Sequence, residues 1–206
     1  METTKKEEFT IAKRISDNKY NLIDANGNYL FEQWFYWVGD FHDGLARVQR
    51  KDGKFNFITA NGKLLSNEWF DWVDYFHDGF AVVKREDSLY NLIDTKGKLL
   101  SEKWFDWADY FENGFAKVQR FDDLMNFITA NGKLLSEKWF EWADYFHDGF
   151  AIVRREDYLM NFIDAKGKLL SNEWFRYADY FDNDGLAVVQ RINGEQCKID
   201  KQGKSE

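Results

Sequence analysis

The chain has 206 residues, of which 19% are aromatic and none is proline, and its formal net charge at pH 7 is −8. An acidic chain is a poor match for nucleic acid or for an anionic membrane surface, because both attract clusters of Lys and Arg. The single cysteine, Cys197, cannot form an internal disulfide, and no Cys or His residues have the spacing of metal ligands. We therefore expect no nucleic acid, membrane, metal or cofactor among the binding partners.

Residues 1–8 are polar and charged, which predicts a charged N-terminal tail rather than the apolar segment of a signal peptide. No run of about 18 apolar residues follows, so a membrane-spanning helix is not expected. These features favour a cytoplasmic protein. A location outside the cell would require a leader that has been removed from this chain.

From residue 9 to residue 204 the sequence repeats itself. A segment that reads Asn, Leu or Phe, Ile, and Asp or Thr recurs every 35 residues, starting at Asn21, Asn56, Asn91, Asn126 and Asn161. A fixed period of this length is typical of repeat proteins. It predicts a single repeat domain over residues 9–204, with partial units at both ends and full units at about 21–55, 56–90, 91–125, 126–160 and 161–196.

Within one repeat the pattern is mostly that of β-strands. Residues 80–85 and 89–93 are short, apolar and rich in β-branched side chains, which predicts two strands joined by a polar turn. Asp94 and Gly97 then hold the first and last positions of a type I turn, with Gly97 at positive φ. Residues 98–101 would form a third, short strand. Each repeat is therefore predicted to be a three-stranded antiparallel meander plus an aromatic connecting segment.

The aromatic segment covers residues 66–79, and its copies contain all nine tryptophans of the chain. Trp69, Trp72 and Phe76 fit the spacing of a helix. Phe70, Trp72 and Phe76 instead alternate with polar residues, and aromatic side chains favour strands. Strand or extended structure is the favoured prediction, and a single helical turn is the alternative. The other copies lie at residues 31–44, 101–114, 136–149 and 171–185.

Two motifs of the repeat point to a known family. Residues 76–83 read Phe-x-x-Gly-Phe-Ala-x-Val, and residues 162–168 read Phe-Ile-Asp-x-x-Gly-Lys. In these motifs the chain resembles the WG repeats of many bacterial proteins, especially those of the Bacteroidetes, and of some phages. The likeness covers roughly residues 11–204. It implies a β-repeat scaffold without a general catalytic role.

The chain departs from the WG repeat pattern at two places. The Trp-Gly pair that names the family is replaced, as in Tyr90-Asn91 and Met125-Asn126. Because Gly and Asn accept positive φ most readily, this exchange predicts a bulge or kink in the second strand, rather than a role for the Asn side chain. The proline usual before the aromatic segment is also missing, which leaves room for a helical turn there.

A three-stranded repeat of 35 residues cannot bury both of its faces, so neighbouring repeats must cover them. Two arrangements satisfy this need: an open superhelical stack, and a closed propeller-like ring of five or six blades. Propeller blades have four strands and about 40–45 residues, which is more than this repeat offers. The open stack is therefore the favoured prediction, and the ring is the alternative.

Histidine and acidic residues recur at fixed positions of the repeat. His42, His77 and His147 precede an Asp and a turn Gly, and we interpret them as turn residues, since Glu112 and Asp182 hold the same position. A ladder of equivalent carboxylates does not supply the two different environments of an acid–base pair. We interpret that ladder as a solvated row or as acceptors for nearby donors: Asp74, Asp109, Asp144 and Asp179, with Asp71, Asp106 and Glu141.

The crowded aromatic residues must divide between core and surface. We expect Phe76 and one tryptophan of each Trp-Phe-x-Trp pair to be buried, and the second tryptophan or the nearby tyrosine to face outward. The candidate binding face then consists of Trp72, Trp107, Trp142, Tyr75, Tyr110 and Tyr145, together with Asp74, Asp109 and Asp144.

No phosphate-binding loop, nucleophile elbow or zinc-protease motif is present, so an enzyme is not expected. Repeat stacks present extended surfaces, and aromatic side chains supply much of the energy of protein contacts. The favoured hypothesis is a non-catalytic repeat scaffold that binds a macromolecular partner, and a protein is the expected kind of partner. The alternative is a glycan- or small-ligand-binding module with one site per repeat.

Overall fold

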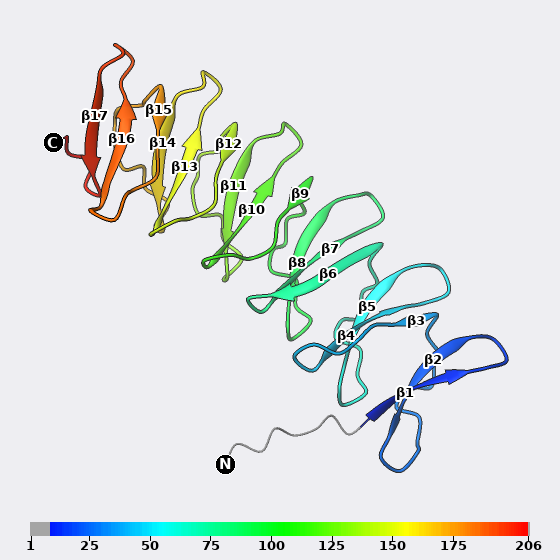
Figure 1. Ribbon diagram of the computed structural model, residues 1–206. Helices are drawn as coiled ribbons and strands as arrows, with labels where there is room; N and C mark the ends of the chain where they lie inside the picture. Colours follow the sequence, from blue (N-terminus) through cyan, green and yellow to red (C-terminus); the bar gives the residue numbers. More distant parts are fainter. Residues whose placement is uncertain (1–8, 206) are drawn as a thin grey trace, which may run out of the picture. The chain divides into compact units, whose positions relative to one another are not determined.

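The computed structural model describes residues 9–205, and the predicted charged tail lies outside this range (Figure 1). The described residues are all β: they contain seventeen strands and no helix, and hence no helix long and apolar enough to cross a membrane. The strands form five three-stranded sheets and one two-stranded sheet, all of them antiparallel. The predicted fold of repeated three-stranded meanders is confirmed.

The described residues gather into two compact units, one that ends at Leu99 and one that begins at Leu100. The first unit contains β1 (Phe9–Arg14), β2 (Lys19–Asp24), β3 (Trp37–Val38), β4 (Leu45–Gln49), β5 (Phe55–Thr59), β6 (Trp72–His77), β7 (Phe80–Lys84) and β8 (Tyr90–Asp94). The second unit contains β9 (Trp107–Ala108), β10 (Phe115–Gln119), β11 (Met125–Thr129), β12 (Trp142–Ala143), β13 (Phe150–Arg154), β14 (Met160–Asp164), β15 (Tyr177–Ala178), β16 (Leu186–Gln190) and β17 (Gln196–Asp200).

The first strand of each three-stranded meander comes from the aromatic segment. In one sheet Trp142 of β12 pairs with Arg154 of β13, and Arg154 in turn pairs with Met160 of β14. Residues 98–101, predicted as the third strand, contribute a single bridge from Leu99. The aromatic segment is therefore extended, as favoured, and contains no helical turn in any of its copies.

The turn after each hairpin has the predicted geometry. The Gly97 amide donates a hydrogen bond to the Asp94 carbonyl at 3.0 Å, and Gly97 has φ of +83°. The Asp94 carboxylate also accepts hydrogen bonds from the amides of Lys96 and Lys98, each at 2.9 Å. These local bonds explain why the turn could be predicted from four residues alone.

At the same turn the backbones of successive repeats lie close together. A Cβ atom placed on Gly167 would lie 1.9 Å from the carbonyl oxygen of Leu135 in the preceding repeat. Gly132 stands in the same relation to Leu100, again at 1.9 Å. Glycine is therefore required here by contact between backbones as well as by positive φ.

Successive sheets of a unit share their hydrophobic core. In the second unit, Phe127 of β11 packs in one buried cluster with Phe140, Ala143 and Phe146 of the aromatic segment that leads into the next sheet. Within each unit the sheets follow one another in chain order, and no strand of the last sheet pairs with the first among the described residues (Figure 1). Each unit is thus an open array of separate meanders.

The buried ring of each aromatic segment is a phenylalanine, not a tryptophan. Phe140 is 2% exposed, whereas Trp139 and Trp142 on either side are only half-buried. The expectation that one tryptophan of each pair lies in the core is wrong. Phe76, also expected in the core, is half-buried, although its counterpart Phe146 is buried. Phenylalanine has no polar atom to satisfy, while an indole N–H needs a partner when it is buried.

In four aromatic segments the first tryptophan is covered by an arginine of the preceding hairpin. The Arg120 guanidinium lies 4.8 Å from the ring centroid of Trp139 and is held there by an ion pair with Asp122 at 2.6 Å. A cation over an indole face is a favourable contact at a protein surface. The same arrangement recurs in the pairs Arg14 with Trp34, Arg50 with Trp69, and Arg155 with Trp174.

The repeated asparagine is a buried hydrogen-bonding group. Asn126 is fully buried, and its amide nitrogen donates to the carbonyl oxygens of Ser136 and Lys138 at 2.8 and 3.0 Å. Its side-chain oxygen accepts from the Phe127 amide at 2.7 Å. Asn21, Asn56 and Asn161 make the corresponding bonds in their own repeats.

The predicted bulge at this asparagine is therefore wrong, because none of the five repeated asparagines has positive φ. The asparagines recur because each side chain bonds to two carbonyl groups at the start of the aromatic segment, an arrangement that we call the asparagine clamp. Positive φ in non-glycine residues falls in turns, for example at Asp43, where two reciprocal bonds between His42 and Leu45 close a tight turn with Gly44. Asp43 and Gly44 both have positive φ, as a type I′ hairpin turn requires.

Candidate functional site

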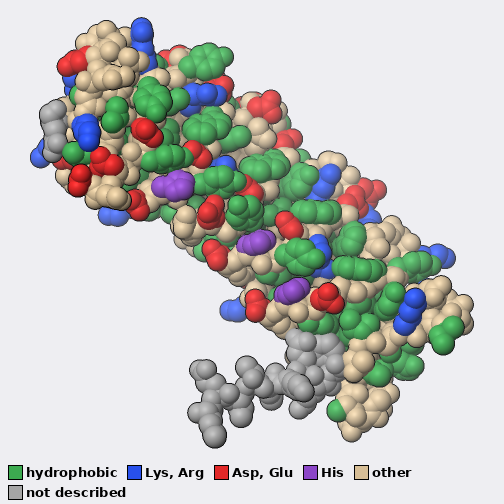
Figure 2. Space-filling view, viewed as in Figure 1, with side chains coloured by type: hydrophobic (Ala, Val, Ile, Leu, Met, Phe, Trp, Pro, Cys, Tyr) green, Lys and Arg blue, Asp and Glu red, His purple; other side chains and the backbone are tan. Residues whose placement is uncertain are grey.

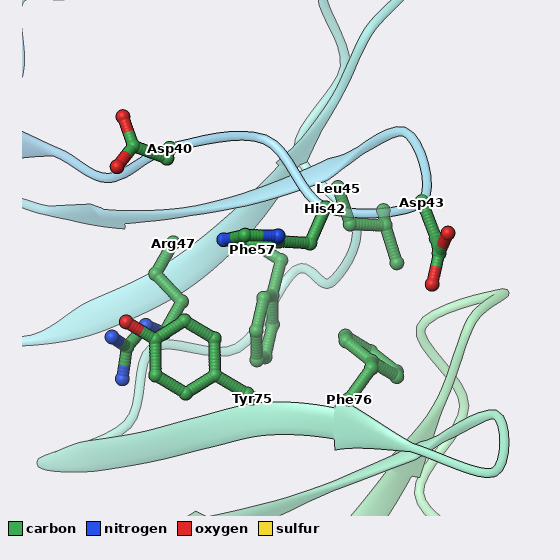
Figure 3. Close-up of a pocket in the computed structure, with 8 residues that line it drawn as sticks. All are labelled: Asp40, His42, Asp43, Leu45, Arg47, Phe57, Tyr75 and Phe76. Carbon is green, nitrogen blue, oxygen red and sulfur yellow. The ribbon is translucent and has the colours of Figure 1, made fainter.

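A pocket of about 430 Å³ opens in the first unit between the sheet β3–β4–β5 and strand β6 (Figure 3). Strands and turns position its side chains. Arg47 and Leu45 lie two residues apart on β4 and so share one face, and Phe57 of β5 pairs directly with Arg47. The full lining consists of Asp40, His42, Asp43, Leu45, Arg47, Phe57, Tyr75 and Phe76.

The pocket has an apolar side and a polar end. Phe57 and Phe76 pack edge to face with ring centroids 4.8 Å apart, and Leu45 lies beside them (Figure 3). At the other end the Arg47 guanidinium lies 3.7 Å from the ring centroid of Tyr75, and one of its nitrogens donates to the Val73 carbonyl at 3.3 Å. Apolar walls with a few convergent polar groups are typical of small-molecule sites.

His42 completes the polar end. Its imidazole meets the Tyr75 ring edge-on at 5.8 Å, and it directly precedes the Asp43-Gly44 turn. His147 holds the same position before its own turn, where it meets Tyr180 at 4.6 Å. Both histidines thus lie at turns, as interpreted from the sequence. Among residues 9–205, no group of three or more His, Cys, Asp or Glu side chains is arranged to hold a metal ion.

The predicted aromatic face is only partly exposed. Trp72, Tyr75 and Tyr110 are 41%, 48% and 40% exposed, so their rings are accessible. Trp107, Trp142 and Tyr145 are half-buried. Of the residues of the predicted binding face, only Tyr75 lines the pocket.

The predicted acidic residues serve the repeat itself. The carboxylates of Asp74, Asp109 and Asp144 each accept a hydrogen bond from the amide of the following tyrosine at 2.8–2.9 Å. In the second unit the ladder also joins repeats, because the Tyr145 hydroxyl donates to Asp109 and the Tyr180 hydroxyl donates to Asp144. These bonds match the interpretation of the ladder as acceptors for nearby donors.

The bond between Tyr145 and Asp109 predicts a pH dependence. The pKa of Tyr145 is raised above its usual range, first by this hydrogen bond and then by burial. An unfolded chain ionises tyrosine near pH 10, so the stabilisation is complete below about pH 10 and is lost as the pH rises through the raised pKa. We expect the wild type to melt at a higher temperature than Tyr145→Phe at pH 8, and this difference to shrink as the pH approaches 11.

Thermal melts followed by circular dichroism between pH 8 and pH 11 would measure this difference. The control is Tyr158→Phe, because the Tyr158 side chain is 67% exposed in a hairpin turn. Its melting temperature should follow that of the wild type throughout. A difference for Tyr145→Phe that grows with pH would contradict the assignment.

Sequence reasoning missed the cations that lie over the tyrosines. Lys117 lies 3.5 Å from the ring centroid of Tyr145, and Arg47 lies 3.7 Å from that of Tyr75. Burial lowers the pKa of Lys117. A signal was present in the sequence. Arg47, Val82 and Lys117 occupy the same position of successive repeats, and Val82 is buried in its strand. A cation at alternate copies of an apolar position indicates that an aromatic ring lies beside it.

Three repeats of the chain match a known family of protein repeats. The profile described as "WG containing repeat" matches residues 22–55, 92–124 and 127–158, three of the predicted units. No curated protein sequence matches the chain.

Several crystal structures are remotely similar. They include the computationally designed Ika8 protein, with a TM-score of 0.37 and 13% identity over 97% of this chain and 70% of that one. BamB from Moraxella catarrhalis has a TM-score of 0.36 and 11% identity over 97% and 69% of the two chains. A protein of unknown function from Bacteroides caccae has a TM-score of 0.31 and 13% identity over 96% and 91%. Likenesses this remote say nothing about what the chain binds.

The family assignment rests on the repeat itself. The profile matches fall on the same 35-residue period that the strands, the turn glycines and the buried asparagines follow. The tight turn with Gly97 and the strand that starts with Phe80 correspond to the two motifs that carried the resemblance. The chain belongs to the WG repeat family.

Proposed function

We propose that this chain is a non-catalytic repeat scaffold that binds a macromolecular partner through the aromatic residues of its repeats. We expect this partner to be a protein. One observation carries the proposal: the aromatic segments leave large rings half-exposed in several repeats. They are Trp37, Trp72 and Tyr75 in the first unit, and Tyr110, Tyr177 and Tyr180 in the second, with exposed fractions between 38% and 48%.

The setting of these rings supports binding. In each unit, Figure 2 shows hydrophobic side chains at the surface, with acidic and basic side chains between them. Trp and Tyr are enriched at the energetic centres of protein interfaces, where a polar rim excludes water. Trp37, Trp72, Tyr75 and Tyr177 lie in strands, so little backbone freedom would be lost at these rings on binding.

The test is a capture experiment with matched aromatic variants. The tagged full chain is used to isolate partners from the cell that produces it, and a partner is then purified and its Kd is measured. Replacing Trp72, Tyr110 and Tyr177 together by Ala is expected to weaken binding by about tenfold or more, the loss typical of aromatic anchors. The fold of the variant is checked by circular dichroism.

The control changes two more exposed rings that lie outside the aromatic segments. Phe121 is 85% exposed and Tyr158 is 67% exposed, both in hairpin turns, and their double Ala variant should bind like the wild type. Equal losses for the two variants would refute the proposal. Binding of sugars from a glycan panel, with a stoichiometry near the number of repeats, would favour the glycan-binding alternative instead.

A further inference from the structure

The pocket beside Arg47 lies where a repeat of the first unit departs from the packing around Phe146 in the second. At the corresponding position of the second unit, Phe115 stacks on Phe146 with centroids 4.2 Å apart, and Phe146 is only 4% exposed. In the first unit the residue that corresponds to Phe115 is Leu45. The shorter side chain cannot cover Phe76, the counterpart of Phe146, so Phe76 stays partly exposed and a pocket remains.

A second departure leaves a hydroxyl group free at the polar end of this pocket. In the second unit, the Tyr145 hydroxyl donates to Asp109 of the preceding repeat. The corresponding partner for Tyr75 would be residue 39, which is a glycine in this chain. Within residues 9–205, no hydrogen bond joins the Tyr75 hydroxyl to another group, and its ring is 48% exposed.

Arg47 brings a positive charge to the same end. Its guanidinium lies over the Tyr75 ring. The N–H groups of a guanidinium lie in its own plane, so they stay available for hydrogen bonds at its edge. Its one hydrogen bond in the described part of the chain goes to the Val73 carbonyl, and it forms no ion pair there. In Figure 3 the carboxylates of Asp40 and Asp43 lie at opposite ends of the pocket and point away from this group.

We propose that this pocket binds a small molecule with one carboxylate on an apolar, preferably aromatic, body. The planar fork of Arg47 matches a carboxylate, with the Tyr75 hydroxyl as a further donor. Leu45, Phe57 and Phe76 would enclose the apolar body, and the volume of about 430 Å³ lies at the lower end of the range of ligand pockets. The two aspartates at the rim disfavour a doubly charged phosphate. The proposal does not depend on the scaffold function.

The test uses carboxylates paired with their neutral amides. Phenylacetate, indole-3-acetate and 4-phenylbutyrate, and the primary amide of each, are titrated into the full chain at pH 7.5. Binding is followed by calorimetry and by amide chemical shifts of residues 40–47 and 73–76. At least one carboxylate is expected to bind about tenfold more tightly than its amide, because only the carboxylate pairs with the guanidinium.

Two variants locate the binding. Leu45→Phe installs the side chain that Phe115 supplies in the second unit, so it should fold normally and abolish binding. Arg47→Met keeps the apolar stem without the charge and should remove the preference for the carboxylate over the amide. The matched control is Lys117→Met, the same exchange at the equivalent position of a repeat without this pocket, and it should bind like the wild type.

The outcomes decide the proposal. It is overturned if no carboxylate of the panel binds the wild type, if carboxylate and amide bind equally, or if Leu45→Phe binds as well as the wild type. Loss of binding in Lys117→Met would also overturn it, because that would place the ligand in the second unit. Loss of the macromolecular partner without loss of carboxylate binding would refute the scaffold proposal alone.

Discussion

Replacing Gly167 by Ala is expected to lower the free energy of unfolding by about 4 kcal/mol or more, a loss that single substitutions reach only through a severe defect such as overpacking against fixed backbone. The added Cβ would lie 1.9 Å from the Leu135 carbonyl oxygen, so one of the two repeats must move. Neither backbone is free to do so, because the Gly167 amide is hydrogen-bonded to the Asp164 carbonyl and the Leu135 amide to the Phe127 carbonyl. Urea unfolding followed by tryptophan fluorescence would measure the loss.

Gly149→Ala separates this contact from the cost of positive φ. Gly149 has φ of +84°, close to the +80° of Gly167, but no atom lies within 4 Å of its Cβ position. It should cost only about 1–2 kcal/mol, the price of the left-handed conformation. If Gly167→Ala fails to fold, Gly203→Ala gives an intermediate case, since its nearest backbone atom lies at 2.9 Å. Equal losses at Gly149 and Gly167 would rule out the inter-repeat contact as the cause.

Replacing Asn126 by Asp is expected to destabilise the second unit by about 3 kcal/mol, because a buried polar group without a partner costs about 1–3 kcal/mol. Asp has the shape of Asn but no N–H group. The carbonyl oxygens of Ser136 and Lys138 would both lose their donor and would face a carboxylate oxygen instead. Protonation of the buried Asp would restore only one donor.

The control for this prediction is Asn172→Asp, which makes the same chemical change at an exposed position. It should alter the free energy of unfolding by no more than about 0.5 kcal/mol. Urea titrations of both variants at pH 7, followed by circular dichroism, would give the two values. Similar midpoints for the two variants would show that the clamp contributes little.

The features that could be predicted from the sequence are those built from neighbouring residues. The turn from Asp94 to Gly97 closes with bonds between residues at most four apart, so its residue types alone defined it. The meander followed from short apolar strands between such turns. The order of its strands did not, because the strand of the aromatic segment pairs with the hairpin that follows it, while the segment keeps only a single bridge to the hairpin before, as between Phe70 and Phe55.

The features that were missed depend on residues far apart in the sequence. The Asn126 amide bonds to carbonyls 10 and 12 residues away, so local φ preference gave the wrong reason for its recurrence. Phe140 fills the core because its ring has no polar atom, whereas Trp139 lies under Arg120 of the previous hairpin. The pocket depends on Leu45 and on the ring of Tyr75 in the next repeat, and a single repeat shows neither.

The asparagine clamp has a consequence for how the chain can change length. Each clamp closes within its own repeat, and each turn glycine meets the repeat just before it, so a duplicated copy of 35 residues brings every partner that it needs. Gene duplication or deletion can therefore alter the copy number without leaving a buried amide unpaired. The one extra residue in the chain, Asp184, lies in a surface turn between the two contacts, where the period can slip without cost to either.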